Sequence, residues 1–338
     1  MAAAFVRERA VAIQAVLHAS KLCQTVFQKL VVGETVIKAD RSPVTGNFSE
    51  ARFADFSAQA VVNTILAEHF PTDPIVGEED TKDLRGDEGK VLRNKVLGLT
   101  NEVLAPEGKE LTEDKLLEAI DRGNYSGGPK GRQWTLDPID GTMGFLRGGQ
   151  FAVCLALIVD GEVQLGVMGC PNLPVNHAKP EGEKGCLFVA RALSAPTEHR
   201  ISFAPLQSTA NSTFCESVEA SHSSHDDTAR IAARLGITRP SVRMDSQAKY
   251  CSISRGDADI YLRLPVGTGY EERIWDHASG SLLVTEAGGT VTDMYGQPLD
   301  FSVGRTLARN TGVVATAAGI HSEILEAVKA VLEEKSRI

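Results

Sequence analysis

The chain has 338 residues, of which 42% are hydrophobic and 23% charged, values that are ordinary for a globular protein. Its formal charge of −9 argues against nucleic acid as the main partner, because a protein that binds a polyphosphate backbone needs a basic face. A small phosphorylated substrate stays compatible with this charge, because a bound cation can invert the local field. At about 150 residues per domain, the length predicts two domains, over residues 1–200 and 201–338.

The first predicted elements are two helices with a strand between them. Apolar residues at helical spacing from Val6 to Leu30 indicate a first helix of the fold rather than a signal or transit peptide. Branched residues in 31–38 predict a strand. A second helix is expected to begin at Asp55, as its N-cap, and to stop before Pro71. No apolar run approaches the ~18 residues of a membrane span, so no membrane contact is expected.

The middle of the chain is predicted to be a charged, loop-like region followed by strands. Residues 81–125 contain one clear helical pattern, over 112–121. Residues 134–136 predict a short strand. Two apolar runs, 151–159 and 163–168, flank an Asp-Gly pair and predict a β-hairpin.

The second half of the chain alternates predicted strands and helices, which indicates an α/β arrangement. The strands are expected at 260–262, 290–291 and 313–315, and the helices at 228–235, 277–286 and 321–333. The six cysteines are scattered without a C-x-x-C pair, and several lie in apolar runs. We therefore expect reduced, buried thiols in a cytoplasmic protein.

Two closely spaced aspartates give the strongest chemical signal. Asp137 and Asp140 follow a predicted strand and are separated by a turn at Pro138, with Gly141 and Thr142 after them. A carboxylate pair suits hard divalent cations, which prefer oxygen ligands. The free N–H groups of a following helix start would attract an anion such as phosphate. The competing interpretation is a turn whose aspartates only cap a helix.

Two further acidic segments are weak signals on their own. Glu78 and Glu79 follow an apolar, strand-like pair, but acidic runs of this kind usually form solvated faces. Asp276 follows Trp275 at a predicted helix start, where its simplest role is that of an N-cap.

Taken in order, three motifs resemble the lithium-sensitive, magnesium-dependent phosphatases of the inositol monophosphatase superfamily: Glu78-Glu79, Asp137-Pro-Ile-Asp-Gly-Thr142 and Trp275-Asp-His-Ala-Ser-Gly280. Three others are similar to its 3′(2′),5′-bisphosphate nucleotidases: His222-Ser-Ser-His-Asp226, Asp245-Ser-Gln-Ala-Lys-Tyr-Cys251 and Tyr261-Leu-Arg-Leu-Pro265. The resemblance extends over nearly the whole chain. It implies a layered α-β-α-β-α sandwich, with an N-terminal α+β domain, a C-terminal α/β domain and the site between them.

The resemblance also implies roles for individual residues. The metal ligands would be Glu78, Asp137, the carbonyl of Ile139, Asp140 and Asp276, holding two or three Mg²⁺ ions. The catalytic residues would be Thr142 and Asp40, which orient and deprotonate a water molecule. The substrate contacts would be Gly141, Thr142, His222, Ser246, Lys249 and Arg263. Without the resemblance, Lys249 reads simply as a surface lysine.

The implied reaction is hydrolysis of the 3′-phosphate of adenosine 3′,5′-bisphosphate, and also of 3′-phosphoadenosine 5′-phosphosulfate. The alternatives are an inositol polyphosphate 1-phosphatase or inositol monophosphatase, or a catalytically silent nucleotide-binding protein of the same fold. The chain departs from the family pattern in three places. Residues 46–53 are inserted near Asp40, the strand past Val189 is shortened at 191–194, and Met143 stands where a lysine is common.

Overall fold

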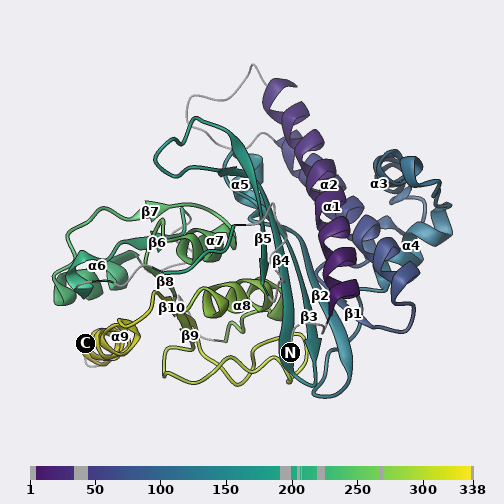
Figure 1. Cartoon of the computed structure of the whole chain (residues 1–338). Coiled ribbons are helices and arrows are strands. Elements are labelled where there is room, and N and C mark those ends of the chain that lie inside the picture. Colours follow the sequence, from purple (N-terminus) through teal and green to yellow (C-terminus); the bar gives the residue numbers. More distant parts are fainter. Residues whose placement is uncertain are drawn as a thin grey trace.

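The computed structural model of the chain describes residues 5–33, 45–190, 199–203, 206, 208–218, 225–265 and 269–335 (Figure 1). Its α-helices are α1 (Val6–Gly33), α2 (Thr45–His69), α3 (Lys90–Leu104), α4 (Glu113–Asp121), α5 (Thr142–Leu146), α6 (His225–Leu235), α7 (Ala248–Arg255), α8 (Ala278–Glu286) and α9 (His321–Lys335). Its strands are β1 (Ile75–Gly77), β2 (Arg132–Asp140), β3 (Ala152–Val159), β4 (Glu162–Pro174), β5 (Lys184–Ala190), β6 (Phe214–Glu216), β7 (Val242–Arg243), β8 (Ile260–Arg263), β9 (Thr290–Thr292) and β10 (Val313–Thr316). A short 3-10 helix, η4 (Ile274–Asp276), precedes α8.

The strands form two five-stranded sheets. Sheet A has the order β1-β2-β3-β4-β5, and sheet B has the order β7-β6-β8-β10-β9. In sheet A, β1 pairs with β2 in parallel and the other neighbours are antiparallel. Sheet A ends at Ala190 and sheet B starts at Phe214. The expected domain division at residue 200 falls between the two sheets and stays a prediction.

Helices and sheets alternate in five layers, which confirms the predicted sandwich. Helices α1 and α2 cover one face of sheet A, α7 and α8 lie between the sheets, and α6 and α9 cover the outer face of sheet B (Figure 1). The side chains of β8 show how both faces of a sheet are buried. Ile260 and Leu262 pack with α6 and α9, whereas Tyr261 packs with α7 and α8. This alternation is the period of two of a β-strand.

The start of the second helix differs from the prediction. Residues 31–33 form the last turn of α1 rather than a strand, and 34–44 lie outside the described residues. Helix α2 begins at Thr45, so Asp55 is an interior helix residue and not an N-cap. The physical reason is that burial continues on the N-terminal side of Asp55. Ala51 packs into the core under α1, and Phe53 packs beside α3 and α4.

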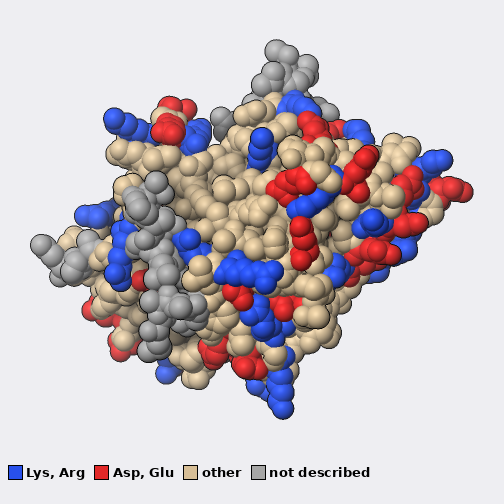
Figure 2. All heavy atoms as spheres, turned by 45° about the vertical axis from the view of Figure 1, so that its right-hand side comes forward, with Lys and Arg blue, Asp and Glu red and all other residues tan. Residues whose placement is uncertain are grey.

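The charged segment 81–125 contains a helix that the sequence pattern did not predict. Helix α3 buries only Val96, Thr100 and Leu104, and this narrow apolar stripe is hard to recognise in a charged stretch. The predicted helix is confirmed as α4, whose N-cap Thr112 accepts a hydrogen bond from the next turn. The face that includes these helices carries interspersed acidic and basic side chains (Figure 2). Arg93 of α3 also forms an ion pair with Glu113 of α4, at 2.8 Å.

The predicted strands and helices that surround the site are confirmed. The Asp160-Gly161 hairpin joins β3 to β4, and both turn residues have positive φ, 50° and 82°, as a type I′ turn requires. The strand predicted at 134–136 is the centre of the longer β2. Strands β8, β9 and β10 and helices α6, α8 and α9 lie within one to three residues of their predicted bounds. The strand shortening at 191–194 lies outside the described residues.

Among the residues that the structure describes, helix α1 has the length and composition of a membrane span. The stretch Val6–Leu30 of α1 has a mean hydropathy of 1.2 over its most apolar window, and 50% of that window is buried inside the fold. The core helix of a globular protein passes the same test, so this feature is weak evidence for a membrane segment.

Candidate active site

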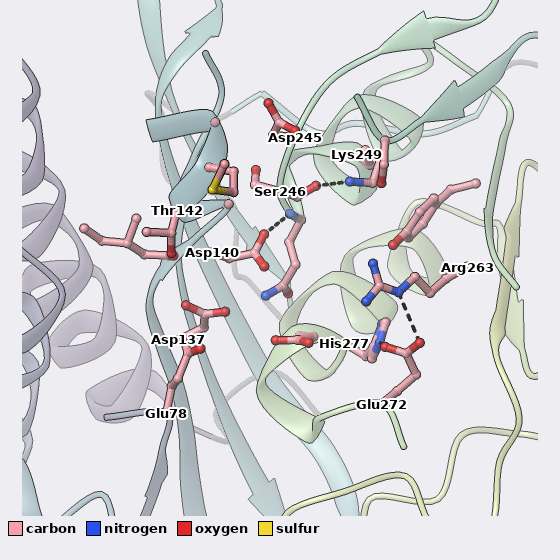
Figure 3. A pocket seen from close by; sticks show the side chains of 18 of the residues that line it. Glu78, Asp137, Asp140, Thr142, Asp245, Ser246, Lys249, Arg263, Glu272 and His277 are labelled. Atoms are coloured by element: carbon pink, nitrogen blue, oxygen red, sulfur yellow. Dashed lines mark hydrogen bonds and ion pairs between the residues drawn. The ribbon is translucent and has the colours of Figure 1, made fainter. Parts of the chain in front are cut away.

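Four acidic side chains converge where sheet A meets the layer of α7 and α8 (Figure 3). Glu78 follows β1, Asp137 and Asp140 lie at the end of β2, and Asp276 ends η4. One carboxylate oxygen from each of the three aspartates lies within 4.8 Å of the others. The structure therefore brings together the acidic residues from all three sequence motifs.

A bulge in β2 aims Asp137 and Asp140 at the same cavity. Asp137 pairs with Cys154 and Asp140 with Ala152, so three steps along β2 oppose two steps along β3. In a regular strand, residues three positions apart point to opposite faces, and one extra residue restores a common side. Pro138 lacks the N–H group that a regular ladder would use at this point. The Asp-Pro-Ile-Asp segment thus contains the bulge that turns the side chains of Asp137 and Asp140 to the same side.

Gly141 allows two chain segments to meet behind the carboxylates. Its φ is +87°, a left-handed conformation that side chains rarely adopt, and it precedes α5. A Cβ atom at this position would lie 2.6 Å from the Cβ of Ser246. Glycine is therefore needed both for the turn and for the close approach of the segment 245–247.

The segment 245–247 is a strained turn held by the residues around it. Ser246 has a φ of +69°, and its hydroxyl accepts a hydrogen bond from the N–H of Ala248 at 3.0 Å. The buried ammonium of Lys249 donates to the carbonyl of Ser246 at 2.8 Å. The backbone N–H of Gln247 donates to Asp140, and its side-chain amide donates to the carbonyl of Trp275 at 3.0 Å. Backbone strain of this kind persists only where surrounding contacts enforce it.

The acidic cluster is electrostatically unfavourable when no cation is bound. Burial raises the pKa of Asp137, and the charges of Glu78, Asp140 and Asp276 raise it further. Burial also raises the pKa of Glu78, to about 7. The pKa values of Asp140 and Asp276 are raised as well, first by burial. A site of this kind stabilises the uncharged acids or a bound cation.

The donor set fits a hard divalent cation. The converging acidic side chains all offer carboxylate oxygens, and Oδ1 of Asp137 is buried without a hydrogen-bond partner among the described residues. The carbonyl of Ile139 accepts a hydrogen bond from the Thr142 hydroxyl at 3.3 Å, and a carbonyl oxygen has a second lone pair for a further partner. Oxygen-only sites of this composition suit Mg²⁺ or Ca²⁺.

The raised pKa values predict how pH affects the stability of the metal-free protein. Glu78 has an ordinary pKa of 4.5 and a folded pKa of about 7, so the folded state binds more protons than the unfolded state in this window. The stabilising contribution of this group is complete below pH 4.5 and is lost as the pH rises through 7. We expect the difference in Tm between protein in Mg²⁺ and protein in EDTA to grow from pH 4.5 to pH 7. A constant difference would show that these acids do not hold the cation.

The opposite wall of the same cavity carries two cations, the buried Lys249 and the partly buried Arg263. The cavity has a volume of about 230 Å³, and its lining includes Thr142, Ser246, Lys249 and Arg263. The pKa of Lys249 is lowered by burial, partly offset by the charge of Asp140. Three predicted substrate contacts, Ser246, Lys249 and Arg263, thus meet in one place. Asp40 and His222 lie outside the described residues, and their roles stay predictions.

Comparison with known proteins identifies the family of this acidic site. The model of the inositol monophosphatase family matches residues 7–333. A 3′(2′),5′-bisphosphate nucleotidase of Emericella nidulans is 49% identical, over 97% of this chain and 99% of the relative. The chain belongs to the inositol monophosphatase family. A 3′(2′),5′-bisphosphate nucleotidase of Schizosaccharomyces pombe is 47% identical, over 97% of this chain and 96% of the relative.

Solved structures of this family share the layered fold. The inositol monophosphatase from Anabaena superposes with a TM-score of 0.59 at 19% identity, over 96% of this chain and 95% of that chain. The inositol monophosphatase of Thermotoga maritima superposes with a TM-score of 0.54 at 22% identity, over 93% of this chain and 96% of that chain. The inositol monophosphatase fold is therefore shown, and the substrate has to be argued from the site itself.

Asp55 joins the acidic cluster although the sequence indicates only an N-cap. Asp55 lies within α2 and its side chain is buried. Its Oδ1 has no hydrogen-bond partner in the part of the chain that the structure describes. Burial raises its pKa, and the nearby charges of Glu79 and Glu78 raise it further. Helix α2 also contacts α5, which begins at Thr142. Asp55 thus adds a further buried carboxylate to the acidic cluster of this inositol monophosphatase-family site.

Three other cavity residues had no recognisable signal of their own in the sequence. Gln247 acts through its backbone N–H, which any residue except proline would supply. The carboxylate of Glu272 accepts hydrogen bonds from Arg263 and His277, at 3.1 Å in each case. His277 was visible only as a neighbour of Asp276. The position of Gln247 and of His277 inside two motifs that resemble the family is a signal that could have found these two residues, whereas Glu272 lies outside those motifs.

Proposed function

We propose that this chain hydrolyses the 3′-phosphate of adenosine 3′,5′-bisphosphate to give AMP and phosphate, with Mg²⁺ as the metal. The observation that carries this proposal is that one cavity joins the acidic cluster to Arg263 and Lys249. A nucleotide with two phosphates would use both sides of this cavity. One phosphate would bind to metal cations held by the acidic cluster, and the other would bind to Arg263 and Lys249. The names of the 49% and 47% identical relatives support this substrate. The same bond in 3′-phosphoadenosine 5′-phosphosulfate is the second proposed target.

The acidic residues would hold two or three Mg²⁺ ions. The proposed ligands are Glu78, Asp137, the carbonyl of Ile139, Asp140 and Asp276. When bound, Mg²⁺ neutralises the phosphate dianion and lowers the pKa of a coordinated water. The chain itself supplies rigid placement of these oxygens, through the β2 bulge and through the hydrogen bond from Gln247 to Asp140. Such preorganisation avoids rearrangement during the reaction.

Thr142 and a carboxylate would prepare the attacking water. The Thr142 hydroxyl donates to the carbonyl of Ile139, which leaves its oxygen lone pairs to accept a hydrogen bond from the attacking water and so orient it. Asp55 is the described carboxylate best suited to take the proton that this water loses, because it is buried, carries an unpartnered oxygen and belongs to the helix that contacts α5. Asp40, predicted for this role from the sequence, stays its competitor.

Arg263 would bind the phosphate that is not hydrolysed. We expect Arg263→Ala to raise KM for adenosine 3′,5′-bisphosphate roughly tenfold to a hundredfold, as for a lost charge-assisted hydrogen bond. Loss of binding common to the ground and transition states leaves kcat nearly unchanged. The change should be small for adenosine 3′-monophosphate, which has no 5′-phosphate. Steady-state kinetics on both substrates measures this difference.

A matched control for Arg263→Ala is Arg243→Ala. Arg243 is a solvent-exposed arginine of the same sheet, whose nearest carboxylate is Glu216 at 3.5 Å. It is expected to leave the kinetics of both substrates unchanged. Equal losses on both substrates for Arg263→Ala would remove Arg263 from the proposed 5′-phosphate site.

Lithium should inhibit the enzyme. The proposed metal ligands are all oxygens, and a small monovalent ion can occupy a Mg²⁺ position while supplying only half the charge. Such an ion would support bound product better than turnover, and Na⁺ is expected to inhibit more weakly. The measurement is a Li⁺ titration at limiting Mg²⁺, with K⁺ at equal ionic strength as control. Unchanged activity across the titration contradicts the proposed ligand set.

Phosphate release on a small substrate panel separates the proposed function from its alternatives. Purified protein at fixed Mg²⁺ is offered adenosine 3′,5′-bisphosphate, inositol 1,4-bisphosphate and inositol 1-phosphate. The expected result is release from the nucleotide in large excess over the others. Preferential cleavage of an inositol phosphate would assign an inositol phosphatase, and no release from any would assign a silent binding protein.

We place the enzyme in the cytoplasm. All six cysteines lie in described parts of the chain and carry free thiols, five of them buried. Free thiols are typical of a reducing compartment.

A further inference from the structure

A network of polar side chains leads from the buried Tyr250 to Arg263, and Figure 3 shows the part that joins His277, Glu272 and Arg263. The Nε of Arg263 donates to Oε1 of Glu272 at 3.1 Å, and Oε2 of Glu272 lies 3.1 Å from Nε2 of His277. Nδ1 of His277 lies 2.7 Å from the hydroxyl of Tyr250. Because a carboxylate only accepts hydrogen bonds, Nε2 carries the imidazole hydrogen, and Nδ1 of the neutral ring accepts from Tyr250.

Tyr250, at the end of this network away from Arg263, is fixed by packing. Tyr250 is fully buried and meets the ring of Tyr261 edge-on at 5.1 Å. Gly280 on α8 makes room for it, since a Cβ there would lie 2.2 Å from the Tyr250 ring. His277 is 2% exposed. Glu272 therefore has a rigid support on the side away from Arg263.

The hydrogen bond to Glu272 determines which edge of the Arg263 guanidinium faces the cavity. With Nε bound to Glu272, the two terminal nitrogens point into the open space of the site (Figure 3). Two parallel N–H groups match two oxygens of a phosphate. The negative charges of Asp140 and Asp276 also attract this guanidinium. Without Glu272, Arg263 keeps its contact with the ring of Tyr270, at 5.9 Å, but loses the ion pair that opposes its attraction to these acidic side chains.

We propose that Glu272, held by His277 and Tyr250, is a positioning residue that aims Arg263 at the phosphate that is not hydrolysed. It thereby sets the preference for bisphosphorylated over monophosphorylated nucleotides, a role that rests on the proposed function. Glu272, Asp276 and His277 are also close enough together to hold a metal ion. Both oxygens of Glu272 are already engaged by Arg263 and His277, which is why we assign Glu272 to the arginine.

Glu272→Gln tests this role with little change in volume. We expect KM for adenosine 3′,5′-bisphosphate to rise about tenfold, with kcat and the Mg²⁺ requirement unchanged and little effect on adenosine 3′-monophosphate. Glu271→Gln is the matched control. Glu271 is exposed, takes no part in the hydrogen bonds from Tyr250 to Arg263, and accepts a hydrogen bond from Thr306 at 2.7 Å. It should behave as wild type.

The double variant shows whether Glu272 acts through Arg263. In the Arg263→Ala background, adding Glu272→Gln should change KM less than twofold, because coupled residues are not additive. Full additivity would overturn the proposal, and so would equal losses on both substrates. A raised Mg²⁺ requirement would instead make Glu272 a metal ligand.

A second variant keeps the proposal testable if Glu272→Gln does not fold. Tyr250→Phe keeps the packed ring and removes the hydroxyl that fixes His277, so a smaller rise in KM for the bisphosphate alone is expected. An unchanged KM in Tyr250→Phe would overturn the proposal. If wild-type protein releases no phosphate from adenosine 3′,5′-bisphosphate, the proposed function itself fails. An active wild type with an unaffected Glu272→Gln variant refutes only the positioning role.

Discussion

Asp137→Asn is expected to abolish turnover while leaving the fold intact. The change removes a charge without removing volume from the centre of the acidic cluster, where Asp137 lies with Asp140 and Asp276. The stabilisation that metal ions give to the transition state is worth several kcal/mol, and each ~1.4 kcal/mol is a factor of ten, so kcat should fall roughly a thousandfold. Steady-state kinetics at saturating Mg²⁺ measures the loss.

The same variant should stabilise the metal-free protein. The pKa of Asp137 is raised by burial and by three neighbouring acids, so its ionised form is unfavourable in the fold without a cation. We expect a higher Tm than wild type in EDTA at pH 7, and a smaller increase in Tm on adding Mg²⁺. The control Asp114→Asn alters an exposed carboxylate of α4 and should shift stability by no more than about 0.5 kcal/mol. Near wild-type rates for Asp137→Asn would remove Asp137 from the mechanism.

Asp55→Asn should cause the second large loss of activity. A positioned general base contributes about a hundredfold to ten-thousandfold to a rate, so kcat should fall within that range. KM for the nucleotide and the Mg²⁺ concentration at half activity should change little, because Asp55 lies behind the proposed ligands rather than among them. Binding measurements with Mg²⁺ separate this result from simple loss of the metal.

Asp40→Asn is the informative partner of this variant. The resemblance gives Asp40 the role of assisting Thr142, whereas the structure offers Asp55 as a buried carboxylate with an unpartnered oxygen. If Asp55 is the base, Asp40→Asn keeps near wild-type kcat. A large loss in Asp40→Asn together with an active Asp55→Asn would reverse this assignment.

Contiguous motifs made much of the site predictable. Asp137 and Asp140 lie in one short segment, whose proline and glycine favour a bulge and a left-handed turn. Their proximity in space therefore depends on residues that are adjacent in the sequence. The Asp160-Gly161 hairpin was predictable for the same reason, since the turn residues determine the turn type. The layered order of helices and sheets followed from the resemblance and from the alternation in the second half.

The remaining features depend on contacts between distant residues. Asp55 looked like an N-cap because the start of α2 is set by burial of Ala51 and Phe53 against other elements rather than by a local signal. The Glu272 chain depends on distances between side chains from α7, β8 and the segment around η4. Residue types alone could not indicate that one carboxylate would accept hydrogen bonds from both an arginine and a histidine.

The position of bond cleavage tests the central claim most directly. Adenosine 3′,5′-bisphosphate is incubated with the purified protein and Mg²⁺, and the nucleotide products are separated and quantified together with released phosphate. The account predicts AMP as the nucleotide product, in equal amount to phosphate. Formation of adenosine 3′-monophosphate, or no cleavage of the nucleotide by a preparation that hydrolyses inositol 1-phosphate, would contradict it.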